Sequence, residues 1–383
     1  MSSEIENLHD DNGGESGGAS GLLEEKYSKQ MRQIHPQKIE LPISTLQAMI
    51  KDQITLNPEF QRRDRWDNKK RSRFVESIIM NVPVPPVFLG EDEYGSYVVL
   101  DGRQRLTAIH EFLKNSFPLE DLTVWKELNG LRYADLELQG LNRTLTRRFI
   151  PAILLLKESS PEVKYDVFDR LNTGGVKANE MEIRNAVFRG AFTKLLHDLS
   201  EIPDFRRMWD IPEDPKARAE NAIYSSMEDV ELVLRFFALR DSQAIEGRLK
   251  DYLGYFMKIR NGIYKSDPAQ KEIDEALFRR AVESTYSILG VDAFSRLSPD
   301  GRYRKSAPLS DAIMHAMSFV NLQQATPEEK ANIKTAIDNL KASNDDFKAA
   351  VTSGTNGKGS ITTRLTLAKE AVTAAAPNAI YQQ

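Results

Sequence analysis

The hydrophobic pattern of this chain of 383 residues changes near residue 190, and that change limits its fold more than any other feature. Before that point, short apolar runs such as Tyr97-Val98-Val99-Leu100 alternate with turn residues and with stretches of helical spacing. Beyond it, apolar residues recur at helical spacing almost throughout, as in residues 232–239 and 312–320. Alternating runs are typical of strands, and the wider spacing is typical of helices. The sequence therefore predicts an α+β N-terminal domain followed by an all-α helical domain.

Four segments follow from this pattern: a disordered acidic tail over residues 1–30, the α+β domain over 31–195, the helical domain over 196–370 and a frayed C-terminus over 371–383. In the tail, glycine pairs stand among Ser, Asp, Glu and Asn, a composition that cannot bury a core. A partner-binding peptide is the alternative. Seven acidic residues and one lysine precede residue 28, so the formal net charge is −4 for the whole chain and +2 without this part. A local basic groove is therefore compatible with the acidic total.

Other features of the composition exclude whole classes of protein. The chain has no cysteine, which excludes a disulfide scaffold, thiolate zinc sites, iron–sulfur clusters and cysteine nucleophiles. It has no apolar run long enough to cross a membrane, and its start lacks the basic and apolar regions of a signal peptide. We therefore expect a cytoplasmic protein that does not bind membranes.

The strongest local pattern is the stretch Leu100-Asp101-Gly102-Arg103-Gln104-Arg105-Leu106-Thr107. It follows the second strand of a predicted hairpin, formed by residues 87–89 and 97–100, and it opens a helix. A helix that begins here directs backbone N–H groups and the positive end of its dipole toward the turn. Gly102 allows close approach to the backbone. The pattern predicts a phosphate cradle.

Asp101 fits a phosphate cradle poorly, because a carboxylate repels phosphate unless it binds a cation, orients water or caps the helix. Asp101 and Gln104 have the spacing of a capping box, which is the structural alternative. The stretch does not match the Walker A pattern, which excludes an ordinary P-loop.

A second pattern is a basic run from Gln61 to Arg73 that contains Trp66. Guanidinium groups bind phosphate through two parallel hydrogen bonds, and an indole can stack on a base. A solvated helix face, with Trp66 as a packing residue, is the alternative. The helix itself is predicted to start after Asp67 and to end before Pro83.

A third pattern joins Arg170-Leu171-Asn172-Thr173-Gly174-Gly175 to a later group of Glu180, Glu182, Arg184 and Asn185. Its polar side chains could contact a ligand at a helix end. A glycine helix cap followed by a new helix is the alternative. The five histidines show no spacing typical of metal ligands, and His110 is expected to be a half-buried helix residue rather than a base.

Together these stretches resemble a known family, the N-terminal ParB/sulfiredoxin-like domain of GmrSD-type restriction systems. The resemblance covers residues 40–195 and rests on five elements in the family's order. These elements are Gln61, Arg62 and Trp66; Glu76 and Ser77; Pro83, Pro85 and Pro86; residues 101–107; and Phe168, Arg170, Asn172, Gly174 and Gly175 with the helix containing Glu182, Arg184, Asn185 and Ala186.

The resemblance implies a pocket that binds a nucleoside triphosphate and hydrolyses it with Mg²⁺, in defence against foreign or modified DNA. By this resemblance, Asp101, Arg103, Gln104 and Arg105 form the catalytic phosphate site, and Asp101 is the candidate metal ligand. The remaining nucleotide contacts implied are Gln61, Arg62, Gly102, Thr107 and Asn172. Arg103 departs from the family, which usually has Gln at this position.

Two alternatives remain open for the activity. The protein could be a DNA-binding module or ParB-like nuclease, with weak DNA contacts from Arg63, Arg65, Lys69, Lys70, Arg147 and Arg148. It could instead be a non-catalytic nucleotide sensor that regulates a partner nuclease. Many relatives carry a fused HNH nuclease, whose paired histidines are not found after residue 190, so we expect none here. We also expect homo-oligomers.

Overall fold

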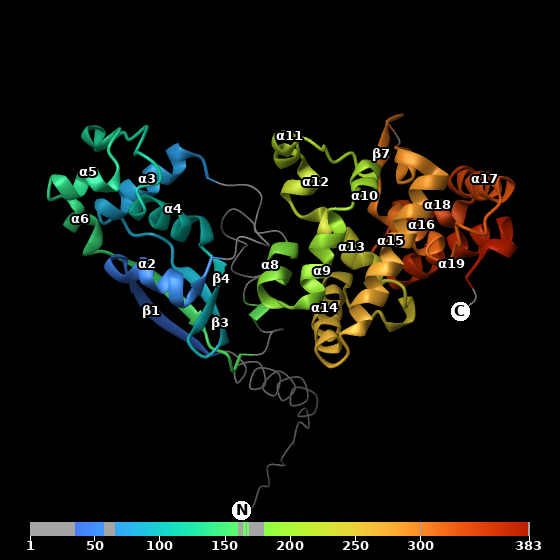
Figure 1. Cartoon of the computed structure of the whole chain (residues 1–383), viewed down its shortest axis with the longest axis horizontal. Coiled ribbons are helices and arrows are strands. Elements are labelled where there is room, and N and C mark those ends of the chain that lie inside the picture. The colour runs from blue at the N-terminus through green and yellow to red at the C-terminus, as the bar shows by residue number, and fades with distance from the viewer. Residues whose placement is uncertain are drawn as a thin grey trace, which may run out of the picture.

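The computed structural model describes residues 35–56, 66–159, 164–165, 167, 180–298 and 300–381. The predicted acidic tail and most of the third pattern lie outside the described residues. In Figure 1 a mixed α/β region occupies one end of the molecule, and helices occupy the other. The predicted α+β fold class, with helices following a mixed domain, is confirmed.

The α/β region is built on one five-stranded sheet. Its strands are β1 (Pro36–Pro42), β2 (Ile54–Thr55), β3 (Val87–Glu93), β4 (Ser96–Asp101) and β5 (Phe149–Leu155). Its helices are α2 (Ile43–Asp52), α3 (Asn68–Ile79), α4 (Arg103–Leu113), α5 (Tyr133–Leu138) and α6 (Asn142–Thr146).

The strand order is β1-β5-β3-β4-β2, and the sheet is mixed. The predicted hairpin is β3 and β4, which pair antiparallel, whereas β3 and β5 pair parallel. Pro151 suggests an edge or a bulge, yet β5 is an inner strand. Proline is tolerated there because the pairing with β3 begins at Ala152, so only β1 adjoins Pro151 through Glu40.

Alternate residues of the central strands pack into two different cores. Val87, Leu89 and Val99 belong to a core that also contains the buried faces of α2, α3 and α4. Phe88 and Leu100 point the other way and belong to the core of the helical region. Period-two alternation thus places the β3–β4 hairpin between both cores.

The helices of this region begin in two different ways, one with a side-chain cap and one without. Asp67 caps α3 by accepting a hydrogen bond from the Lys70 N–H at 2.8 Å, as the sequence predicts. At α2, by contrast, Pro42 is the N-cap and no side chain caps the helix. The Ile43 N–H instead donates to the Arg148 carbonyl at 3.0 Å, which lets β1 run directly into α2.

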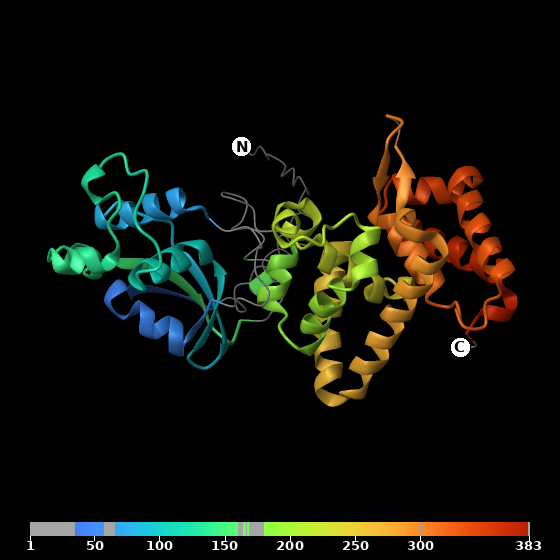
Figure 2. The ribbon, with the colours of Figure 1, turned by 45° about the horizontal axis from the view of Figure 1, so that its top comes forward.

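The helical region begins with α8 (Glu180–Val187) and contains one hairpin, β6 (Ser295–Leu297) with β7 (Tyr303–Lys305). Figure 2 shows this hairpin and the α14–α15 pair projecting from opposite edges. The other helices are α9 (Ala191–Ser200), α10 (Pro203–Met208), α11 (Pro215–Glu220), α12 (Ala222–Ser225), α13 (Glu228–Ala238), α14 (Leu249–Ser266), α15 (Ala269–Leu289), α16 (Ala307–Met317), α17 (Pro327–Ser343), α18 (Asp345–Thr352) and α19 (Lys358–Ala375).

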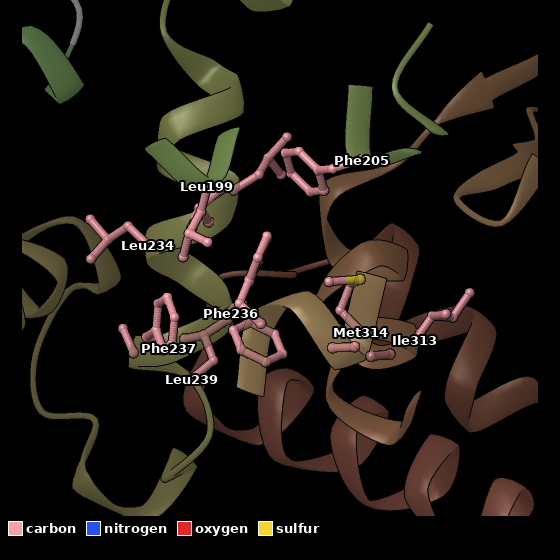
Figure 3. Close-up of a cluster of buried hydrophobic side chains, with 14 of the residues drawn as sticks. Leu199, Phe205, Leu234, Phe236, Phe237, Leu239, Ile313 and Met314 are labelled. Atoms are coloured by element: carbon pink, nitrogen blue, oxygen red, sulfur yellow. The ribbon is translucent and has the colours of Figure 1, made fainter. Parts of the chain in front are cut away.

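Aromatic and aliphatic side chains from several helices fill the core of this region, and Figure 3 shows Phe205, Phe236 and Phe237 among them. The Phe205 and Phe236 rings each lie edge-on to Phe278, at 5.5 and 5.1 Å between centroids. Edge-on pairs of this kind add to the stabilisation from burial.

The C-terminal end is packed as far as Tyr381, contrary to the predicted frayed segment over 371–383. Helix α19 continues to Ala375, and Ile380 forms a β-bridge with Val320. Val372 and Ala379 are fully buried. These apolar contacts hold the segment against α16 in a way that local sequence does not reveal. Among the described residues, no helix is long and apolar enough to cross a membrane.

Candidate functional site

The turn between β4 and α4 depends on Gly102. This residue has φ of +87°, a left-handed conformation that side chains disfavour. A Cβ at this position would also lie 2.4 Å from Cγ1 of Val87 in β3. Gly102 is the N-cap of α4, and no side chain caps the helix. The first turn therefore presents backbone N–H groups that have no partner within the helix.

Asp101 is held by Arg105 and does not cap the helix, which rules out the capping-box alternative. The Arg105 Nη2 atom donates to Asp101 Oδ2 at 2.6 Å, and Nη1 donates to the carbonyls of Pro85 and Pro86. The Asp101 side chain is 40% exposed and that of Arg105 only 13% exposed. Arg105 therefore joins the end of β4 to the proline-rich entry of β3, and its guanidinium is occupied by protein groups.

Gln104 connects α4 to the described end of the basic run. Its Oε1 atom accepts a hydrogen bond from the Trp66 N–H at 3.3 Å. The Trp66 ring packs edge-on against Phe74, and the Lys70 ammonium lies 5.1 Å from the ring centroid. Trp66 therefore packs on α3, as the structural alternative predicts. Gln61, Arg62, Arg63, Arg65 and Asn172 lie outside the described residues.

Arg103 lies within electrostatic range of Glu182 and Arg189, and it forms no ion pair with any residue that the structure describes. Its Nε atom is buried and has no hydrogen-bond partner among the described residues. Burial lowers the pKa of this guanidinium; Glu182 of α8 raises it, and Arg189 lowers it further. Among the described residues, the ion-pair partner of Arg189 is the exposed Asp92 carboxylate, at 3.9 Å. The charge of Arg189 thus acts on the Arg103 guanidinium, although the two arginines belong to different elements.

Thr107 and His110 follow Arg103 along α4 at helical spacing, and both are half-buried. The Nδ1 atom of His110 is buried and has no hydrogen-bond partner among the described residues. Burial, assisted by Lys114, lowers the pKa of His110, so its imidazole is neutral at pH 7. This agrees with the predicted half-buried helix residue.

The predicted weak DNA contacts that fall among the described residues lie at the two ends of α3, whereas Arg63 and Arg65 lie outside the described residues. Lys69 lies 3.9 Å from the Asp121 carboxylate at the start of α3. Arg148 donates to the Ile79 carbonyl at the other end of α3, and Arg147 beside it is exposed. Lys70 and Ile79 are nine positions apart in α3, which corresponds to about 14 Å along the helix axis.

Within the described residues, no group of three or more Asp, Glu or His side chains could hold a metal ion. Asp101 offers one carboxylate, and one of its oxygens already accepts from Arg105. Mg²⁺ is often held by one carboxylate together with substrate phosphates, and this donor set fits only that mode.

Arg184, named in the third pattern, has a structural role. It is fully buried and pairs with Glu231 of α13 at 2.7 Å and with Glu180 at 3.0 Å. It also donates to the Lys250 carbonyl in α14. Sequence reasoning missed Arg189, because an isolated arginine after an α-helix carries no local signal.

Residues 43–189 match the family model described as the N-terminal domain of the GmrSD restriction endonuclease. The match starts at α2 and ends after α8, so it includes the β4–α4 turn, Arg103 and Arg189. No curated protein and no solved structure matches the chain.

Proposed function

We propose that this protein acts in a restriction system, binds a nucleoside triphosphate at the start of α4 and hydrolyses it with Mg²⁺. The match of residues 43–189 to the N-terminal domain of the GmrSD restriction endonuclease supports the first part of the proposal. The observation that carries the proposal is Arg103, whose buried Nε atom has no hydrogen-bond partner among the described residues. Guanidinium groups in low-polarity surroundings bind phosphate strongly.

Three features support phosphate as the ligand. The first turn of α4 has no side-chain cap, so its backbone N–H groups are available to an anion. Arg103 opens this turn, and Arg189 is close enough to lower the pKa of the Arg103 guanidinium. The αL conformation of Gly102 lets β4 turn directly into α4, which places the uncapped helix start at the end of β4.

Each residue then has a distinct task. Arg103 and Arg189 neutralise phosphate charge, while Arg105 holds Asp101 in place through its 2.6 Å ion pair. The exposed part of the Asp101 carboxylate would hold Mg²⁺ that arrives with the nucleotide, and the ion would supply charge neutralisation at the phosphates. Asp101 is therefore expected to matter for hydrolysis more than for binding.

The test compares Arg103→Ala with Arg73→Ala, an exposed arginine paired with Asp121 at 3.0 Å. A charged hydrogen bond contributes about 1.5–3 kcal/mol. We therefore expect Arg103→Ala to weaken binding of a fluorescent nucleoside triphosphate roughly 10- to 100-fold. Binding by Arg73→Ala should equal that of the wild type. Unchanged binding in folded Arg103→Ala would disprove the site.

Hydrolysis is tested separately, by phosphate release with Mg²⁺ and after its removal with EDTA. Asp101→Asn should release little phosphate and still bind nucleotide. If the wild-type protein binds nucleotide without Mg²⁺-dependent release, it is a nucleotide sensor of the kind that regulates a partner nuclease.

A further inference from the structure

A second group of cationic side chains surrounds Phe319, which follows α16. Figure 1 shows α16 and α19 at the opposite end of the molecule from α4. The group consists of Arg240, which follows α13, Arg280 of α15, His315 of α16 and Lys369 of α19. We call these four residues the Phe319 cluster. None of them belongs to the matched family domain.

The contacts around the Phe319 ring fix the geometry. The Lys369 Nζ atom lies 4.2 Å and the Arg240 Cζ atom 5.6 Å from the ring centroid. The His315 ring is edge-on to Phe319 at 5.2 Å between centroids. Two cations and one titratable ring therefore share a single aromatic side chain.

Arg280 joins the cluster through the C-terminal segment. Its Cζ atom lies 4.9 Å from the ring centroid of Tyr381. The Tyr381 N–H donates to the Phe319 carbonyl at 2.8 Å, which fixes this segment against the end of α16. Arg280 is exposed, whereas Arg240 and Lys369 are half-buried.

The positive charges of this cluster have no ion pair within the described part of the chain. Arg240 donates to the neutral Ser318 hydroxyl at 2.8 Å. The acidic group that acts on Arg240 is Asp274, which already accepts from Arg260, Tyr264 and Gln270. Grouped cations repel one another, and an anion bound among them would offset that repulsion.

His315 reports on this excess of positive charge. Burial and, to a smaller extent, the charges of Arg240 and Lys369 together lower its pKa to about 4. Its Nδ1 atom is buried and lacks a hydrogen-bond partner within the described residues. His315 is therefore neutral at pH 7 and can donate one hydrogen bond to an anion.

We propose that the Phe319 cluster is a second anion site, which binds phosphate groups through Arg240, Arg280 and Lys369. Phosphate matches the donors, because guanidinium groups bind it through paired hydrogen bonds and an ammonium binds it as a point charge. The source is either a nucleic acid backbone or a free phosphate compound, and the chemistry at the cluster is the same for both.

The matched variants are Arg280→Ala and Arg279→Ala. These neighbours on α15 are both exposed, but Arg279 pairs with Glu275 and lies outside the cluster. Lys369→Gln is the third variant. The probes are a labelled short DNA duplex, followed by fluorescence anisotropy, and inorganic phosphate and pyrophosphate, followed by calorimetry.

We expect Arg280→Ala and Lys369→Gln each to weaken binding of at least one probe roughly tenfold or more, with Arg279→Ala unchanged. A loss confined to duplex DNA, with a shallower salt dependence, identifies a nucleic acid backbone as the source. A loss confined to phosphate or pyrophosphate identifies a free compound. Equal affinities in all four proteins, or no binding of any probe at low salt, would overturn the proposal.

NMR of His315 provides a readout that does not depend on folding of a variant. A bound anion offsets the charges of Arg240 and Lys369, so the probe that binds should raise the pKa of His315 from about 4. A pKa that stays constant in saturating probe contradicts binding at this cluster. If Lys369→Gln fails to fold, the exposed Arg280 and the histidine titration still decide the outcome.

Discussion

At the scale of single residues, the β4–α4 turn shows why one glycine determines the candidate site. Gly102 combines φ of +87° with a neighbour, Val87 Cγ1, that would lie 2.4 Å from any Cβ. The sequence motif predicted that a ligand could approach the backbone at Gly102. It did not show that Val87 of β3 packs against Gly102 and fills the space that a side chain would need. That contact depends on strand pairing, which links residues far apart in the chain.

Gly102→Ala should destabilise the protein by about 2–4 kcal/mol, since left-handed strain and overpacking add together. The matched control is Gly95→Ala, which has φ of +78° and no heavy atom within 4 Å of its Cβ. It should lose only the strain, about 1–2 kcal/mol. Urea unfolding measures both. Equal losses in the two variants would contradict the contact with Val87.

At the scale of elements, sequence signals worked where the partner is local. Asp67 caps α3 because its carboxylate reaches the Lys70 N–H within one turn. The spacing of Asp101 and Gln104 suggested a capping box at the start of α4, and that interpretation is wrong because of residues outside the local sequence. Arg105, anchored by the Pro85 and Pro86 carbonyls, takes the Asp101 carboxylate instead.

Helix α8 likewise combines two roles that its sequence does not separate. Arg184 is fully buried between Glu180, Glu231 and the Lys250 carbonyl, so it ties α8 to α13 and α14. Arg189, just after the helix, is 29% exposed and lies near Arg103. One arginine therefore holds the helices together, and the other is available to a ligand.

Arg184→Ala should lower the free energy of unfolding by about 3–5 kcal/mol, because it leaves two carboxylates without their buried partner. Arg189→Ala should keep wild-type stability and weaken nucleotide binding roughly tenfold. Thermal unfolding and a nucleotide titration, run on both variants, measure the contrast. If Arg189→Ala is as unstable as Arg184→Ala, Arg189 is also structural.

At the scale of the whole molecule, the change of hydrophobic period near residue 190 predicted an α/β region and a helical region. It did not predict the interface at which the two regions pack together. Phe88, Leu100 and Leu155 alternate with residues of the sheet's own core, so the sequence shows strands buried on both faces. It cannot show that Met181 of α8 and Phe188, the residue after α8, cover the second face, because residues far apart in the chain meet there.

Because the sheet and the helices share this core, the stability of each region should depend on the other. Leu100 is 8% exposed and belongs to the same core as Phe237 and Met314, although its strand lies in the sheet. Leu100→Ala leaves a cavity at this interface and should cost about 2–5 kcal/mol. Leu138→Ala, at a leucine that is 87% exposed on α5, should change stability by less than about 0.5 kcal/mol.

Tryptophan fluorescence shows which region of the protein is destabilised by Leu100→Ala. Trp209 is buried in the helical core, whereas Trp66 packs on α3. In a variant that retains only Trp209, Leu100→Ala should still lower the unfolding midpoint, because the second face of the sheet is part of the core around Trp209. A midpoint that moves only when Trp66 is the reporter would mean that the sheet and the helices unfold independently.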